Sequence, residues 1–401
     1  IPAVEHLAQA QIRLGRGLEA RRTLDHLKAN FGPPEQHEVD YPRIWEQAWL
    51  QRFGTEDEAA HGFEQLVQSF GPERALDLLR LGCRWVRYVD IPSAQEMLGS
   101  NLFGVAQRIR SPDDAAGGLL AIALGKLGQG RITGALASFD AIVPETRLPE
   151  VRLQARMQAA EWRVIPYALG LEGFGLEDAE AGADTLGVLW ADLSDEQPIL
   201  RARVAFGLAS LAARAEQGAE AAAWSDSLRL LESLLGPSTT SRKSRLLDGL
   251  TLAAAGEFRR ALEATDSLVA YDSVALGADP FGRAATYWLR AGWQAEAGDT
   301  IAALRTLYWH ENTDLEEGTA DGLAQAAEVD AALGVHARAR AVEIAGRLTG
   351  DEPVAGLPRC DLVRTRAREV LRLWNDPDPT ILPVRRRVAP ILEQTEAECG
   401  T

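Results

Sequence analysis

A short phrase recurs along this chain: an apolar, helix-like segment, a Gly, and an Ala five positions after the Gly. Its six copies are Gly15 with Ala20, Gly54 with Ala59, Gly130 with Ala135, Gly256 with Ala261, Gly298 with Ala303, and Gly334 with Ala339. Because Gly enters left-handed backbone conformations without a steric penalty, each Gly predicts the end of a helix and a sharp turn. Each Ala falls inside the next helix, where its small side chain lets an antiparallel neighbour approach closely. Repetition every few tens of residues predicts stacked helical hairpins rather than separate globular domains.

The residues around this phrase resemble a known family. The position four residues after the Ala is apolar in most copies, and it holds Leu24, Phe63, Phe139, Thr265, Leu307 and Glu343 in turn. The pattern resembles tetratricopeptide repeats, and it is closest at Gly15, Ala20, Leu24, Pro33, Gly298, Ala303 and Leu307. The resemblance implies an all-α fold, a right-handed α-solenoid of about nine to ten antiparallel helix pairs. It also implies a concave groove, lined by the first helix of each pair, that binds proteins.

The regularity of the repeats predicts four segments. They are N-terminal repeats at 1–164, an irregular acidic insertion at 165–197, C-terminal repeats at 198–375, and a capping helix with a tail at 376–401. The insertion is expected because the stretch from Tyr167 to Asp184 is rich in Gly and acids and loses the repeat pattern. We expect a helix to resume at Thr185. Pro383 and Pro390 predict that the last helix is broken or bent.

Composition and charge exclude several classes of protein. Hydrophobic residues make up 46% of the chain, which is typical of a folded protein. No apolar run approaches the ~18 residues that a membrane span needs. The net charge is −16, which disfavours nucleic acid as a partner because phosphate binding requires clustered Lys and Arg.

Charge is also segregated along the chain. The segment from Val164 to Leu200 has eight acids and no Lys or Arg, whereas the segment from Val335 to Pro390 has eleven Arg. We call these the acidic segment and the arginine-rich segment. Either both are solvated faces, or they meet opposite charges on a partner or on another copy of this chain.

Signatures of catalysis are missing. The Gly-x-Gly-x-x-Ala run that begins at Gly15 imitates a dinucleotide-binding motif, but it follows no strand and falls at a repeat turn. The chain has no Gly-x-Ser-x-Gly or His-Glu-x-x-His motif. His310 is followed by several acids, which fit either an exposed loop or a weak metal site. We therefore expect no enzyme activity, no cofactor and no metal.

The three cysteines leave the compartment open. Cys83 lies in an apolar stretch and is most simply a core residue. Cys360 and Cys399 flank the last helices, where a disulfide would hold the terminal cap and favour an extracytoplasmic location. Their spacing alone does not decide whether they form this bond.

The family register predicts which residues face the groove. It places Leu120, Leu124, Leu246, Leu250 and Trp288 on first helices, and Trp293 follows on the same helix as Trp288. This inner face is unusually apolar, so its occupant could be a peptide, a partner helix or the chain's own acidic insertion. Trp288 and Trp293 are five residues apart and cannot point into one seam. A register shift by one residue would instead make these side chains ordinary core.

The prediction from sequence is therefore a non-enzymatic scaffold that binds a protein or peptide, with these six residues as candidate contacts. Two alternatives remain. The chain could be a structural subunit that assembles with copies of itself, or the docking portion of a larger kinase or transcription regulator.

Overall fold

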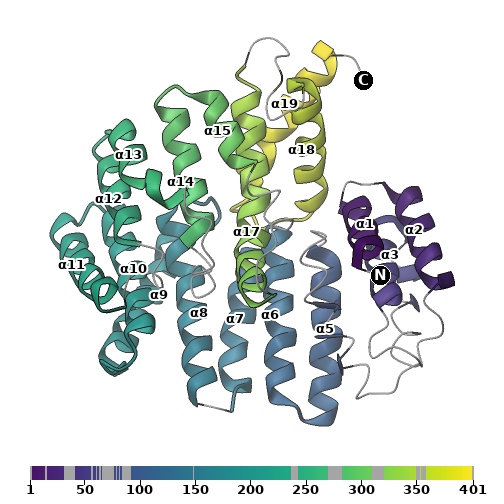
Figure 1. Ribbon diagram of the computed structural model, residues 1–401, viewed down its shortest axis with the longest axis horizontal. Coiled ribbons are helices and arrows are strands. Elements are labelled where there is room, and N and C mark those ends of the chain that lie inside the picture. Colours follow the sequence, from purple (N-terminus) through teal and green to yellow (C-terminus); the bar gives the residue numbers. More distant parts are fainter. Residues whose placement is uncertain are drawn as a thin grey trace. The chain divides into compact units, whose positions relative to one another are not determined.

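The chain is helical wherever it can be described. The computed structural model describes residues 2–13, 16–30, 41–55, 57–59, 61–62, 65, 76–77, 79–80, 82–83, 92–147, 149–235, 243–269, 282–308, 320–348, 353 and 358–399. These ranges contain helices and connecting turns, and they contain no β-strand (Figure 1). The predicted all-α class is confirmed.

Successive helices pack as neighbours. Their bounds are α1 (Pro2–Arg13), α2 (Gly17–Asn30), α3 (Tyr41–Phe53), α5 (Pro92–Ile109), α6 (Pro112–Gly128), α7 (Ile132–Glu145), α8 (Pro149–Ala168), α9 (Leu176–Asp192), α10 (Pro198–Arg214), α11 (Gly218–Leu235), α12 (Lys243–Ala254), α13 (Phe258–Val269), α14 (Gly282–Glu296), α15 (Thr300–Leu307), α17 (Ala320–Ala345), α18 (Arg359–Leu373) and α19 (Leu382–Cys399). The pairs α1/α2, α5/α6, α10/α11, α12/α13, α14/α15 and α18/α19 are in direct contact. Short turns between such neighbours are the usual connection of a helical hairpin.

The chain forms two compact units. The first comprises residues 1–129 and 137–152, and the second comprises residues 130–136 and 153–401. The first has a core built around Trp45, Leu24 and Ile12. In the second, Val164, Leu186 and Val204 bring α8, α9 and α10 together. The division of the repeats at 164, 197 and 375 stays a prediction.

Three copies of the recurring phrase form the expected turn. Gly130, Gly256 and Gly298 have φ of 71°, 77° and 87°, in the left-handed region that favours Gly. The alanines five residues later, Ala135, Ala261 and Ala303, are fully buried. Gly15 and Phe63, as well as His310 with the acids after it, lie outside the described residues.

The copy at Gly334 is a wrong prediction. Gly334 lies inside the continuous helix α17 and ends nothing. At Gly298, the residue after the Gly helps to start the next helix. Asp299 follows Gly298 and caps α15 by accepting a hydrogen bond from the amide of Ala302 (3.0 Å). Gly334 is followed by Val335, which cannot cap a helix, and then by an Ala-rich stretch that favours helix.

The expectation of an irregular segment at 165–197 is wrong over most of its length. Helix α8 continues to Ala168, and α9 begins at Leu176, well before Thr185. In the turn between these helices, Gly170 and Gly173 have the left-handed φ values of 72° and 99°. Gly182 lies inside α9, where a Cβ would come within 2.9 Å of the carbonyl oxygen of Ala160. It therefore serves close packing of α9 against α8 rather than a break in the helix.

The last helix is not broken. Helix α19 runs without interruption from Leu382 to Cys399, with Pro390 inside it. It packs against α17 and α18, and its Val384 and Val388 are buried.

Candidate binding surfaces

The predicted groove residues divide into buried and half-buried side chains. Leu124, Leu246, Trp288 and Trp293 are buried, whereas Leu120 and Leu250 are half-buried. Leu120 and Leu124 belong to the first unit and the other four residues to the second. None of the six is exposed. Their role in partner binding stays a prediction, and Leu120 and Leu250 are the two that offer partly open surface.

Trp288 on α14 contacts another part of the same unit. Its indole Nε1 donates a hydrogen bond to the carbonyl oxygen of Leu169, at the end of α8 (2.9 Å). The guanidinium of Arg340 lies 4.8 Å from the centre of the Trp288 ring. It also fills the space beside Gly292, where a Cβ would come within 2.6 Å of Nη2. Burial lowers the pKa of Arg340, against the opposing effect of Glu296 and Glu343.

The turn between α8 and α9 is held by three further residues. Nε2 of His336 donates a hydrogen bond to the carbonyl oxygen of Glu172 (3.0 Å), since a carbonyl can only accept. Arg387 binds the Glu172 carboxylate and also that of Glu343 (2.7 Å). Gly173 lies against the side chain of Ile381. Leu169, at the start of the 169–175 turn, is the residue of this turn that binds Trp288.

Trp293 packs in the opposite direction from Trp288. A Cβ at Gly249 of α12 would lie 2.8 Å from the Trp293 ring and 2.9 Å from the Thr265 methyl group. Trp293 therefore fills the seam among α12, α13 and α14. The two tryptophans do point into different seams, as their spacing requires.

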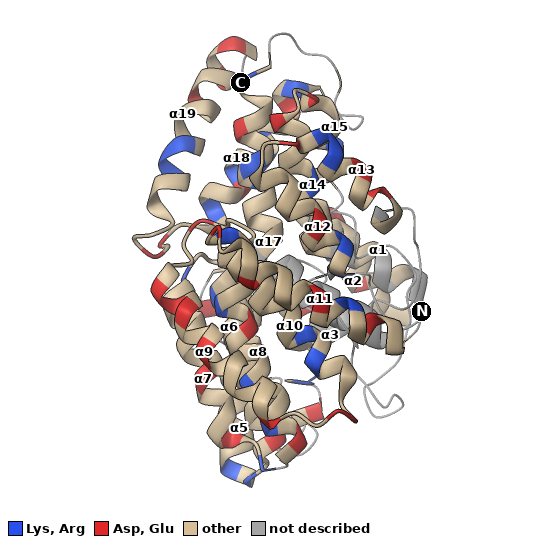
Figure 2. Ribbon diagram, turned by 90° about the vertical axis from the view of Figure 1, so that its left-hand side faces the viewer, with Lys and Arg blue, Asp and Glu red and all other residues tan. Residues whose placement is uncertain are grey.

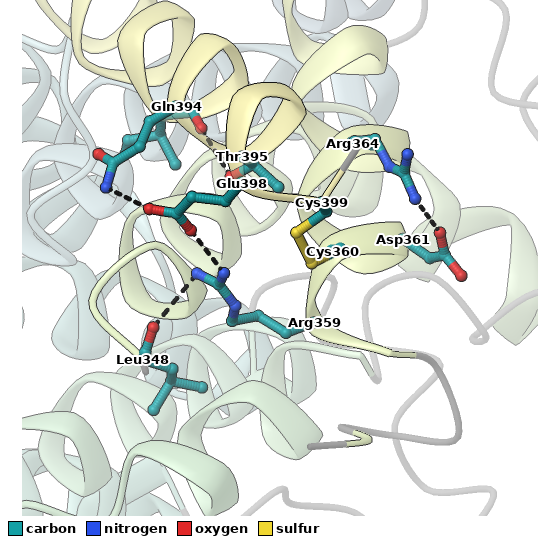
Figure 3. Close-up of a disulfide and its surroundings, with 10 residues drawn as sticks. Leu348, Arg359, Cys360, Asp361, Arg364, Gln394, Thr395, Glu398 and Cys399 are labelled. Atoms are coloured by element: carbon teal, nitrogen blue, oxygen red, sulfur yellow. Dashed lines mark hydrogen bonds and ion pairs between the residues drawn. A yellow bond between two sulfur atoms is a disulfide. The ribbon is translucent and has the colours of Figure 1, made fainter. Parts of the chain in front are cut away.

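A disulfide joins the last two helices. The sulfurs of Cys360 and Cys399 are bonded, and their Cα atoms are 6.3 Å apart (Figure 3). Next to it, Arg359 binds the carboxylate of Glu398 (2.8 Å) and the carbonyl oxygen of Leu348 (3.2 Å). Hydrogen bonds from Arg359 and Gln394 lower the pKa of Glu398. Covalent and ionic contacts thus fasten the C-terminal end of α19.

The arginine-rich segment is largely neutralised from within. Six of its arginines pair with carboxylates: Arg338 and Arg372 with Glu369, Arg359 with Glu398, Arg364 with Asp361, Arg368 with Glu396, and Arg387 with Glu172 and Glu343. Two more, Arg340 and Arg366, lie over the rings of Trp288 and Tyr308. Most of this positive charge is therefore used inside the fold.

The acidic segment is mostly unpaired. Glu172 binds Arg387, and Asp195 binds Arg201. Within the described part of the chain, the other acids of the segment form no ion pair: Glu177, Asp178, Glu180, Asp184, Asp192 and Glu196. Figure 2 shows acidic residues in red along α9. These six acids therefore keep negative charge that no described cation neutralises.

Helices α9 and α11 are among those that expose large apolar side chains outside the predicted groove. On α11, Leu230 and Leu234 are 64% and 70% exposed, and on α9 Val188 is 52% exposed. Between these helices, the rings of Trp190 and Trp224 meet edge to face, with centroids 5.1 Å apart. The helical period would have pointed to these outer faces once the acidic stretch was recognised as a helix.

In the described residues, no group of three or more His, Cys, Asp or Glu side chains is placed to hold a metal ion. No helix there combines the length and hydropathy required to cross a membrane. The chain matches no family model and no curated protein sequence.

Proposed function

We propose that this chain is a non-enzymatic scaffold that binds a protein or peptide. In this proposal its helical hairpins stack as a tetratricopeptide-like, right-handed solenoid, with about nine to ten pairs. The observation that carries the proposal is the exposure of Val188, Leu230 and Leu234 on the outer faces of α9 and α11. Leu230 and Leu234 lie one helical turn apart on α11, and neighbouring exposed apolar side chains favour an interaction surface.

The proposed contact surface differs from the groove expected from sequence. Trp288 and Trp293 are buried by contacts within the second unit, so a partner would have to displace those contacts to reach them. Leu250 is half-buried and stays the better probe of the groove. The outer residues of α9 and α11 require no rearrangement to be reached.

The test is affinity capture with the tagged chain from an extract of its source organism, at low and at moderate salt, read by mass spectrometry. We expect a stoichiometric partner that is lost when Leu230 and Leu234 are both replaced by Glu, or when the acids of α9 are reversed. Replacing Leu250 with Asp tests the groove in the same experiment. A partner lost only with the Leu250 change would move the contact to the groove.

Two outcomes would overturn the scaffold proposal. One is that no protein is retained at stoichiometric level by the folded chain. The other is that only this chain is recovered, in multiples that salt releases, which would indicate the self-assembling alternative.

A further inference from the structure

The outer face of α9 combines unpaired charge with a small apolar centre. Its exposed residues, which we call the α9 face, are Glu177, Glu180, Ala181, Asp184, Gly187, Val188, Ala191 and Asp192. They recur at intervals of three and four residues, so they share one side of the helix. The opposite side, with Ala179, Leu186 and Leu189, is fully buried against the rest of the second unit.

The charge on this face has no partner inside the described part of the chain. Glu177, Glu180, Asp184 and Asp192 form no ion pair there, although their helix contacts α10, which carries three arginines. Arg203 is used by the buried Glu161, and Arg201 by Asp195. Arg214, the third, is exposed near Gly170 in the turn before α9 and forms no ion pair with a described residue. The four carboxylates therefore remain available to cations from outside.

The centre of the α9 face has small side chains that would let another helix approach closely. A Cβ at Gly187 would meet no atom within 4 Å, so the space above this residue is open. Ala181 and Ala191 present only methyl groups, and Val188 adds an exposed apolar side chain. Small residues in such a row let another helix approach to interaxial distances of about 8–10 Å. Glycine inside a helix costs about 1 kcal/mol relative to Ala, and no contact within the chain uses this one.

A second copy of this chain is a poor occupant. Its basic segment is the natural candidate to meet the acids, but six of the eleven arginines there are paired with carboxylates. Two more are stacked on aromatic rings. Nucleic acid and anionic membranes are disfavoured because their phosphates would meet four carboxylates. A cationic protein segment fits both the charge and the apolar centre.

We propose that the α9 face docks a cationic amphipathic helix of another protein. The helix would place an Ala- or Leu-rich stripe over Gly187 and Val188 and would set Lys or Arg on both sides, opposite Glu177, Glu180 and Asp184. Helix α9 has 17 residues, which corresponds to a contact about 25 Å long. This inference names the partner class of one proposed contact surface, and it therefore rests on the proposed function.

Direct titration of the full chain tests this docking. The probe is a synthetic 18-residue helical peptide with an Ala/Leu stripe flanked by Lys, and its control is a scrambled peptide of the same composition. We expect saturable binding of the helical peptide, at least tenfold tighter than that of the scramble, and weakening with added salt. Equal binding of the two peptides, or no saturable binding of either, would overturn the proposal.

Matched variants locate the contact. Glu180→Lys combined with Asp184→Lys should weaken binding of the helical peptide at least tenfold, and Gly187→Leu should weaken it by filling the open space. Glu220 on α11 is equally exposed and lies off the face, so Glu220→Lys should have at most a twofold effect. If Glu220→Lys weakens binding as much as Asp184→Lys alone, the attraction is general electrostatics and the docking proposal fails.

The capture experiment separates this failure from that of the proposed function. A stoichiometric partner that survives the Glu180 and Asp184 reversal but is lost with the Leu230 and Leu234 changes would leave the scaffold standing. It would place the contact on α11 and overturn docking on the α9 face.

Discussion

The acidic segment and the arginine-rich segment look symmetrical in the sequence but are used in opposite ways. Six arginines of the second pair with carboxylates of the same chain, and two more lie over aromatic rings. In the first, only Glu172 and Asp195 are paired with a described residue. One block of charge belongs to the fold, whereas the other faces outward.

The side chains explain this difference. An arginine covers apolar surface with its stem and donates several hydrogen bonds from a planar head, so it can be packed among helices. A short Asp or Glu on the outside of a helix has no such reach. Segregated charge in a sequence therefore does not by itself predict two complementary surfaces. What matters is which block keeps its charge unpaired after folding.

Among the changes that test this comparison, Cys399→Ser should have the largest effect on stability. The disulfide spans 39 positions of sequence and fastens the arginine-rich helices, so its loss should lower their free energy of unfolding by about 4 kcal/mol in the chain-entropy model. Hydrogen exchange of peptides from α19, followed in urea, measures the change. Reduced wild-type chain and Cys360→Ser should behave alike. An unchanged exchange rate in all three would show that the bond contributes nothing to the hold on α19.

A second prediction contrasts two acids that lie close in sequence. Glu161 is buried and paired with Arg203 (2.9 Å), so Glu161→Ala strands a cation that is mostly buried. We expect a loss of about 3 kcal/mol in the free energy of unfolding of the second unit. Asp184→Ala removes an unpaired exposed acid and should change it by less than about 0.5 kcal/mol. Urea denaturation of both variants tests the contrast, which fails if the two losses are equal.

Sequence predicted those parts of the fold that depend on local chemistry. The turns at Gly130, Gly256 and Gly298 were predictable because a left-handed residue there favours Gly. The turn at Glu216, with φ of 58°, does not show as a copy of the phrase because its residue is not Gly, although Ala221 follows it at the same spacing and is buried. The phrase at Gly334 does not predict a turn correctly, because the Ala-rich sequence on both sides favours a continuous helix that can tolerate one Gly.

The candidate surfaces were less predictable, because they depend on contacts between distant segments. Trp288 bonds to a carbonyl 119 positions away, and Arg387 to a carboxylate 215 positions away. No pattern in a single sequence indicates such pairs. The α9 face was hidden for a different reason. In the sequence, Gly182 and the acids are typical of a loop, but this Gly packs against α8 and the acids lie on the outer side of a helix.

A third prediction is a smaller difference in stability between variants of two adjacent arginines of α19. Arg387 binds Glu172 and Glu343, and the hydrogen bond with Glu172 raises its pKa. Because the site is partly exposed, Arg387→Ala should lower the free energy of unfolding by only about 1 kcal/mol. Arg386 is exposed and has no ion pair with any described residue, so Arg386→Ala should have no measurable effect. Thermal unfolding of the two variants gives the comparison, and equal midpoints would contradict it.

The smallest expected effect is a pH dependence at the end of α19. Hydrogen bonds from Arg359 and Gln394 lower the pKa of Glu398 below 4.5, so the charged carboxylate favours the folded state. A lowered pKa gives stability that is present above the unfolded value and is lost as the pH falls through the folded value. Amide exchange at the end of α19, normalised to the intrinsic rate at each pH, should therefore accelerate as the pH falls below about 4.5. Glu398→Gln removes the titrating group and should flatten this dependence, whereas Glu393→Gln, on an exposed residue of the same helix, should leave it unchanged. If Glu398→Gln keeps the full slope, the acid sensitivity belongs to another carboxylate, and the Arg359 contact adds to packing rather than to charge.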